Sequence, residues 1–109
     1  MWAVPKNRES LGWLVYLAEM SCDQASNWAW SVWTGSRLHP HKFALEQARG
    51  CIERARLQLP LMLAHKDRNR SVRTYVRRLR RKILGIERHL AAAQARLQTP
   101  RVSLRGSAP

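Results

Sequence analysis

The chain has 109 residues, a length that predicts one domain with a modest core and excludes a multi-domain enzyme. Twenty Lys and Arg stand against seven Asp and Glu, sixteen of the twenty are arginine, and the formal net charge is +13. This excess indicates a large anionic partner. Because 45% of the residues are apolar and five are tryptophan, the composition excludes a disordered basic tail.

The two cysteines and the apolar runs indicate the cellular compartment in which the protein is expected. Cys22 and Cys51 are too few for a disulfide scaffold and form no CxxC pair, so we expect reduced, half-buried thiols. The longest apolar run, 11–18, is well short of the roughly 20 residues of a membrane span. The start of the chain has no secretory signal pattern. We expect a cytoplasmic or mitochondrial-matrix protein that is not secreted and has no membrane span.

The first predicted element is a helix over about 10–33, in which apolar residues recur at alternating steps of three and four. Ser10 is suited to cap its start and Gly35 to end it. The polar stretch 21–27 leaves open a division of this helix into two. Its apolar seam consists of Leu11, Val15, Ala18, Cys22, Ala25, Ala29 and Val32.

The second predicted element is a helix over about 40–64. Pro40 suits a first helical turn, and Pro60 is expected to bend the helix. Its seam consists of Leu45, Ala48, Ile52, Ala55, Leu59 and Met62.

The third predicted element is a helix over about 71–98, with Ser71 as candidate N-cap and Pro100 as terminator. The segment 100–109 lacks periodicity and is expected to be a disordered basic tail. The seam of the third helix consists of Val72, Val76, Leu79, Ile83, Ile86, Leu90, Ala93 and Leu97.

These elements predict an all-α fold. The linkers 34–39 and 65–70 are short, so successive helices are expected to be antiparallel. The expected architecture is an up-down-up three-helix bundle or a long helical hairpin, with heptad seams. Residues 1–99 are expected to form a single domain. The first two seams are rich in Ala and Cys, and the third in Leu, Ile and Val. Large side chains of the third helix are therefore expected to fill the space left by small ones opposite.

The strongest functional signal is a basic run near the start of the third helix, opposed only by Asp67 and Glu87. At about 100° per residue most of its arginines share one stripe beside the apolar seam, and Arg78 and Lys82 widen it. Guanidinium groups bind phosphate bidentately and stack on bases, which favours a nucleic-acid contact over a merely solvated face. The predicted contacts are Lys66, Arg68, Arg70, Arg73, Arg77, Arg78, Arg80, Arg81, Lys82 and Arg88.

A second signal is apolar surface in excess of what one small core covers, which is typical of protein contacts. On the second helix Leu57, Leu61 and Leu63 lie off the seam. Tryptophan also stacks on bases, but among 28–33 the nearest cation in sequence is Arg37, which favours core or protein interface for these tryptophans. The predicted protein-interface residues are Trp2, Trp13, Leu17, Met20 and Trp30.

Catalysis, a metal and a cofactor have no support in the sequence. The four histidines show no ligand spacing, and the chain contains no nucleophile elbow, paired carboxylates or phosphate-cradling glycine loop. We expect a protein that is not an enzyme.

Residues 34–90 carry a partial resemblance to a known family. The segments 53–61 and His65-Lys66-Asp67-Arg68-Asn69-Arg70-Ser71, followed by Arg73, Val76, Leu79, Arg81-Lys82 and Ile86, resemble the small-subunit ribosomal protein fifteen family. The order also resembles it: a leading helix, a Thr-Gly-Ser turn, a long helix, a polar loop and an Arg-rich helix. The chain departs from the family at Leu61, where the family has histidine, and at Arg88, where it has an aromatic residue. The resemblance implies a helical bundle at a ribosomal RNA junction, with Thr34, Gly35 and Ser71 as RNA contacts.

The sequence thus favours a non-catalytic structural subunit of a ribonucleoprotein, such as a ribosome or a CRISPR effector complex. RNA is the expected partner and DNA is a second possibility. Protein neighbours are expected to contact the apolar surface. The alternative is a supernumerary helical subunit of a mitochondrial respiratory or ATP-synthase complex, in which the arginines contact acidic partners or lipid head groups. A free regulatory DNA binder is less favoured because no helix-turn-helix is recognisable.

Overall fold

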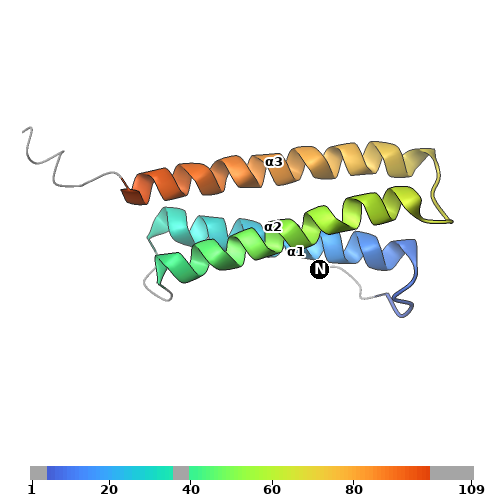
Figure 1. The fold of residues 1–109 in the computed structure, drawn as a ribbon, viewed down its shortest axis with the longest axis horizontal. Helices are drawn as coiled ribbons and strands as arrows, with labels where there is room; N and C mark the ends of the chain where they lie inside the picture. Colours follow the sequence, from blue (N-terminus) through green and yellow to red (C-terminus); the bar gives the residue numbers. More distant parts are fainter. Residues whose placement is uncertain (1–4, 36–39, 99–109) are drawn as a thin grey trace, which may run out of the picture.

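The computed structural model describes residues 5–35 and 40–98, which form three helices: α1 (Leu11–Thr34), α2 (His41–Ala64) and α3 (Arg70–Gln98) (Figure 1). No strand occurs in the described ranges. The all-α prediction is confirmed, and the helix bounds agree with the predicted ones to within a residue. Trp2 and the predicted C-terminal tail lie outside the described residues.

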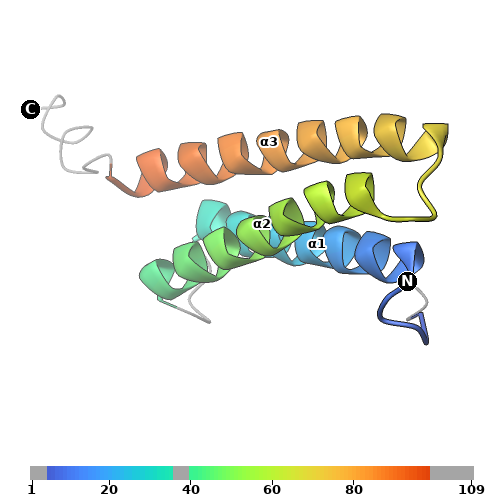
Figure 2. The ribbon, with the colours of Figure 1, turned by 45° about the vertical axis from the view of Figure 1, so that its right-hand side comes forward.

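The three helices lie side by side with alternating direction. Figures 1 and 2 show α3 running along the pair formed by α1 and α2, with the 65–69 loop at one end of the bundle and the end of α1 at the other. The up-down-up bundle is confirmed. All three helix pairs are in contact, and α1 packs most extensively against α2.

The ends of α1 are capped as the sequence predicts. The Oγ of Ser10 accepts a hydrogen bond from the Trp13 amide at 3.1 Å. Gly35 has φ of 70°, the left-handed region that favours glycine, and its amide donates to the carbonyl oxygens of Ser31 and Val32. The helix is continuous through 21–27, where Ser21 is fully buried. The structure therefore has one helix here and not two.

The start of α3 differs from the prediction, whereas α2 has the predicted bounds to within a residue. α3 begins at Arg70, and the Val72 amide donates to the Asn69 carbonyl at 3.1 Å, so Ser71 lies inside the first turn and is not the N-cap. α2 starts after Pro40 without a side-chain cap and continues as one helix through Pro60, which is exposed. A proline on the solvent side leaves only its own missing N–H and one carbonyl unpaired, which the rest of the helix tolerates.

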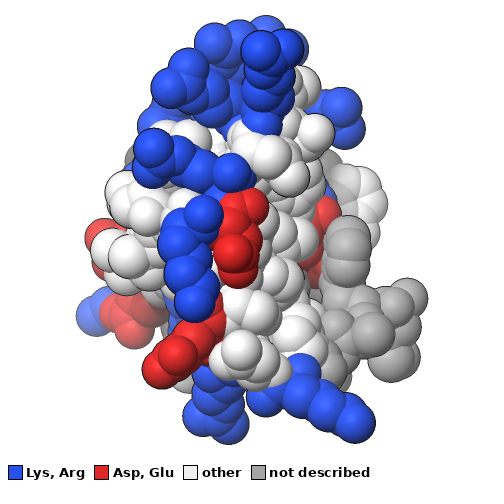
Figure 3. Space-filling model, turned by 90° about the vertical axis from the view of Figure 1, so that its right-hand side faces the viewer, with Lys and Arg blue, Asp and Glu red and all other residues white. Residues whose placement is uncertain are grey.

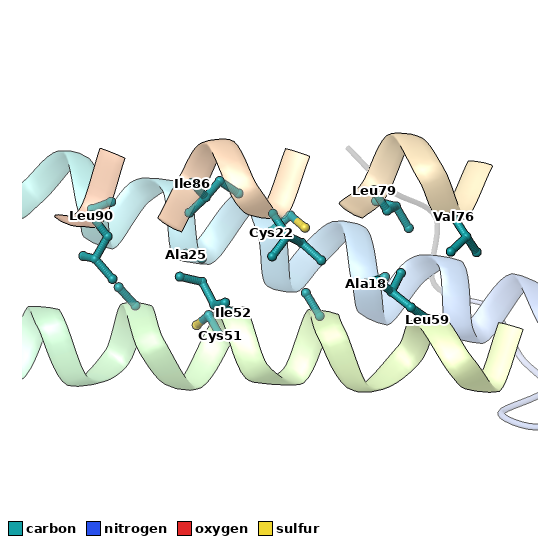
Figure 4. Close-up of a cluster of buried hydrophobic side chains, with 14 of the residues drawn as sticks. Ala18, Cys22, Ala25, Cys51, Ile52, Leu59, Val76, Leu79, Ile86 and Leu90 are labelled. Atoms are coloured by element: carbon teal, nitrogen blue, oxygen red, sulfur yellow. The ribbon is translucent and has the colours of Figure 1, made fainter. Parts of the chain in front are cut away.

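The core combines small residues with large ones, as predicted (Figure 4). The buried residues of α1 in this cluster are alanine and cysteine, and α2 adds Ile52, Leu59 and Met62 to its alanines and cysteine, while the branched side chains of α3 pack against both helices. Leu97, at the end of the third seam, is 37% exposed and the one described member of that seam outside the core. The core residues of the main cluster are Ala18, Cys22, Ala25 and Ala29 of α1, Ala48, Cys51, Ile52, Ala55, Leu59 and Met62 of α2, and Val72, Val76, Leu79, Ile83, Ile86 and Leu90 of α3.

Both cysteines are free and buried, with Cys22 1% and Cys51 4% exposed, so they lie deeper than the half-buried position predicted. Burial raises the pKa of the Cys22 thiol to about 11. The positive charge of Lys82 lowers this pKa, but by less than burial raises it. At neutral pH the Cys22 thiol is therefore protonated and acts as a small apolar side chain.

One polar cluster lies in the interface of α1 and α3. Glu19 of α1 is 8% exposed, and its carboxylate is 3.6 Å from the Nζ of Lys82, which also lies 3.8 Å from Asp23. The buried Tyr75 hydroxyl faces Glu19 without completing a hydrogen bond of normal geometry, and burial, followed by the charge of Glu19, raises the pKa of Tyr75. The cluster joins α1 to α3 through charged and polar side chains.

Candidate nucleic-acid interface

The outer side of α3 carries a row of exposed arginines. Its seam residues face α1 and α2, so the residues between them in sequence project outward by the helical period. Figure 3 views the bundle from the 65–69 end and shows Lys and Arg gathered over α3. We call this set the arginine face: Arg70, Arg73, Arg77, Arg78, Arg80, Arg81 and Arg88, all exposed.

The arginine face has no carboxylate partner within the described ranges. Glu87, the acidic residue of α3, pairs instead with Arg56 of α2. Several arginines repel one another at three- or four-residue spacing, among them Arg73 with Arg77 and Arg77 with Arg81. A surface of uncompensated like charge is stabilised by any polyanion that approaches it.

Lys82 belongs to a different environment. The sequence groups it with the nucleic-acid contacts, but in the structure its ammonium lies near Glu19 and Asp23 in the α1–α3 interface. It is still 42% exposed. The Lys82 ammonium therefore serves as a counter-charge for the buried Glu19 carboxylate of α1.

The loop between α2 and α3 extends the basic surface at one end of the bundle. Lys66 and Arg68 are exposed, and Arg68 donates to the Leu63 carbonyl at 3.0 Å. A surface depression next to it is lined by Leu63, Arg68, Asn69, Arg70, Val72 and Arg73. The loop thus adds two cations in line with the start of the arginine face, where Ser71 is also exposed.

A histidine fixes this loop. The Asp67 amide donates to the Nδ1 of His65 at 3.0 Å, so the ring proton is on Nε2, which donates to the Glu9 carbonyl at 2.8 Å. The side chain of His65 thereby connects the segment before α1 to the loop before α3. This linkage holds the backbone that carries Lys66 and Arg68.

Thr34 and Gly35 lie at the other end of the bundle from Ser71, since α1 ends where α3 approaches its own C-terminal end (Figure 1). The Thr34 hydroxyl donates to the Ser31 carbonyl at 3.3 Å. The structure therefore does not bring together the three RNA contacts that the family resemblance implies.

The predicted protein-interface residues fall into two groups. Trp13, Leu17 and Met20 are partly buried, and Trp13 packs on Tyr16 with the guanidinium of Arg8 5.4 Å from its ring centroid. The most exposed apolar side chains are Leu57, at 64%, Trp30, at 58%, and Leu61, at 51%. The leucines lie on α2, which places a partly apolar surface on a different helix from the arginine face.

A cluster that sequence reasoning missed joins α1 to the C-terminal half of α3. The ring of His89 lies 5.7 Å from the ring centroids of both Trp30 and Trp33, and the Arg96 guanidinium lies 4.8 Å from the ring centroid of Trp33. The two tryptophans of α1 lie more than fifty positions before His89 and Arg96 of α3 along the chain, so only the packing of α3 on α1 shows the cluster.

Other site types find no support in 5–35 and 40–98. These ranges contain no group of three His, Cys, Asp or Glu side chains arranged to hold a metal, and no helix in them is long and apolar enough to cross a membrane. A comparison of the chain with protein-family models, curated proteins and solved structures finds no significant match. The resemblance to the ribosomal family rests on the quoted residues alone.

Proposed function

We propose that this protein is a small, non-catalytic RNA-binding subunit of a larger ribonucleoprotein assembly. The observation that carries the proposal is the arginine face, a continuous row of exposed guanidinium groups without carboxylate partners among the described residues. From Arg70 to Arg88 it extends about 27 Å along a rigid helix, a length that spans several phosphates. Guanidinium forks bind phosphate oxygens bidentately, so the face fits a nucleic-acid backbone.

The bundle positions this face for structural rather than sequence-reading contacts. Arginines spaced along one helix surface follow a backbone of regular charge, whereas base readout requires a helix inserted in a groove. The exposed leucines of α2, Leu57 and Leu61, remain available for a protein neighbour. Such a subunit would join RNA on one side to protein on another.

The experiment is an equilibrium RNA-binding titration at increasing salt with the double variant Arg77→Glu/Arg81→Glu. We expect the variant to bind RNA of different sequences more weakly by a similar factor and to lower the slope of log affinity against log salt by about two. The matched control is Lys42→Glu/Arg54→Glu, which makes the same charge change on exposed positions of α2. Equal losses in both variants would contradict a role for the arginine face. DNA of the same sequence tests the choice of RNA.

The second candidate is a helical subunit of a large protein complex in which the arginines contact acidic side chains or lipid head groups. The observation that favours it is the exposure of Leu57 and Leu61, which a protein neighbour would cover. A wild-type protein that binds no RNA at low salt but binds acidic vesicles or an acidic protein would support this candidate in place of the first.

A further inference from the structure

We infer that Trp30 on α1 is a stacking platform for an unpaired base, and that the nucleic acid bound by the arginine face is therefore single-stranded where it passes this residue. The inference rests on the proposed function and specifies its ligand further. The sequence groups Trp30 with the protein contacts because no cation lies close to it along the chain. The fold instead places α3 beside it.

Trp30 is 58% exposed, and the other described tryptophans are all more buried. Its ring is held in place by His89, whose ring plane is inclined at 61° to it. An edge contact of this kind fixes the orientation of an indole ring while leaving a face open. A ring that is already ordered loses little conformational entropy when a base stacks on it.

On the α3 side of Trp30, the residues one turn from its contact His89 are small. One turn before and one turn after His89, α3 carries Gly85 and Ala92, both exposed and both small. Even a Cβ added to Gly85 would meet nothing within 4 Å. No large side chain of α3 at these two positions therefore competes with a base for the indole ring.

The charges around Trp30 favour a phosphate backbone. Residues 26–34 of α1 contain no carboxylate, and Glu87 pairs with Arg56 of α2. Arg88, a member of the arginine face, immediately precedes His89 in α3, and Arg96 lies two turns beyond. By the helical period Arg96 lies on the same side of α3 as His89, and its guanidinium contacts Trp33, whereas Arg88 lies about 100° around the helix, on the arginine face. A strand that crosses α3 from the arginine face toward α1 would thus pass from cations to aromatic rings, the combination found in single-strand binding sites.

The observations favour a base over an apolar protein contact. The neighbours of Trp30 one turn away on α1 are Ser26, Asn27 and Thr34, which are polar, and Trp33, which is more buried and also contacts His89. The most exposed leucines among the described residues, Leu57 and Leu61, are on α2. Trp30 and Trp33 therefore form a small aromatic pair beside His89 within a largely polar surface. Protein interfaces are marked by continuous apolar patches instead.

The experiment compares wild-type protein with Trp30→Leu and Trp30→Phe in binding a fluorescently labelled single-stranded RNA of about 15 nucleotides and the same RNA annealed to its complement. We expect Trp30→Leu, which keeps apolar bulk but has no π face, to weaken single-strand binding by about five-fold to 100-fold. Trp30→Phe is expected to retain most of the affinity, and duplex binding is expected to be the same in all three proteins. Because Trp30 is not in the ionic contact, the salt dependence should be unchanged.

The outcomes distinguish this inference from the proposed function. If Trp30→Leu binds the single strand as tightly as wild type while Arg77→Glu/Arg81→Glu binds weakly, the stacking role is wrong and the RNA-binding function stands. If Trp30→Leu weakens single-strand and duplex binding equally, the residue does not recognise an unpaired base. If wild-type protein binds neither RNA, both proposals fail, and Trp30 returns to the class of protein-interface residues. Circular dichroism of each variant confirms that the exposed substitution leaves the bundle folded.

Discussion

Lys82 shows how one residue of a basic run takes a structural role while its neighbours do not. It lies next to Arg81 in the sequence, yet the helical period turns it toward α1, where it meets Glu19 and Asp23. Glu19 is 8% exposed and has already lost most of its hydration. A buried carboxylate without a cation nearby is costly, so the Lys82 ammonium is required at this position.

Replacing Lys82 with methionine is expected to lower the free energy of unfolding by about 1–3 kcal/mol, because Glu19 would remain buried without a counter-charge. Arg81→Met is the matched control, since Arg81 is exposed and unpaired with any described carboxylate, and its effect should stay within about 0.5 kcal/mol. Urea unfolding of the three proteins measures both changes. Equal stability of the two variants would contradict a structural role for the lysine.

At the scale of the element, the ends and the buried side of each helix depend on short sequence patterns. The Ser10 cap and the left-handed Gly35 delimit α1, and the α3 seam is buried along almost its whole length. The glycines within helices are different from Gly35. Gly50 of α2 and Gly85 of α3 are exposed, and a Cβ built on either meets nothing within 4 Å.

Gly85→Ala and Gly50→Ala are each expected to raise the free energy of unfolding by up to about 1 kcal/mol, because alanine has the higher helix propensity and neither site is crowded. Gly35→Ala is expected to lower it by a similar amount, since the residue has φ of 70°. Thermal and urea unfolding of the three variants checks the opposite signs. A loss of stability at position 85 would indicate a packing constraint that the structure lacks.

At the scale of the whole molecule, charge is distributed unevenly. Of the net charge of +13, residues 65–98 carry about +9, with eleven Lys and Arg against Asp67 and Glu87, while α1 supplies the acidic side chains that face α3. The free protein therefore contains like-charge repulsion that its own carboxylates do not cancel. A polyanion that binds the native state relieves this repulsion and stabilises the fold.

Added salt is expected to raise the melting temperature of the free protein, because it screens repulsion among exposed arginines one turn apart. At about 0.2–0.5 kcal/mol for each such pair, the rise should amount to several degrees. Circular dichroism melting curves at increasing sodium chloride measure it. Arg77→Gln/Arg81→Gln should show a smaller rise, and a melting temperature that is flat or falls with salt in the wild type would contradict the argument.

The class of fold, the helix bounds and the arginine face follow from the order of the amino acids alone. These features depend on interactions within a few residues: the 3.6-residue period of the seams, the caps Ser10 and Gly35, and the spacing of Arg70 to Arg88. α3 begins one residue earlier than the sequence predicts, because a hydrogen bond from the Val72 amide to the Asn69 carbonyl, rather than the Ser71 hydroxyl, begins the helix.

Which side chains from different helices meet depends on how the helices pack. The engagement of Lys82 by Glu19, the burial of Cys22 and Cys51, and the contact of His89 with Trp30 all depend on the register of α3 against its neighbours. No local pattern encodes that register, because it results from how branched side chains of α3 fit over the small residues of α1 and α2. The sequence thus determined where the charge lies along the chain, and the packing of the helices determined which aromatic ring lies beside it.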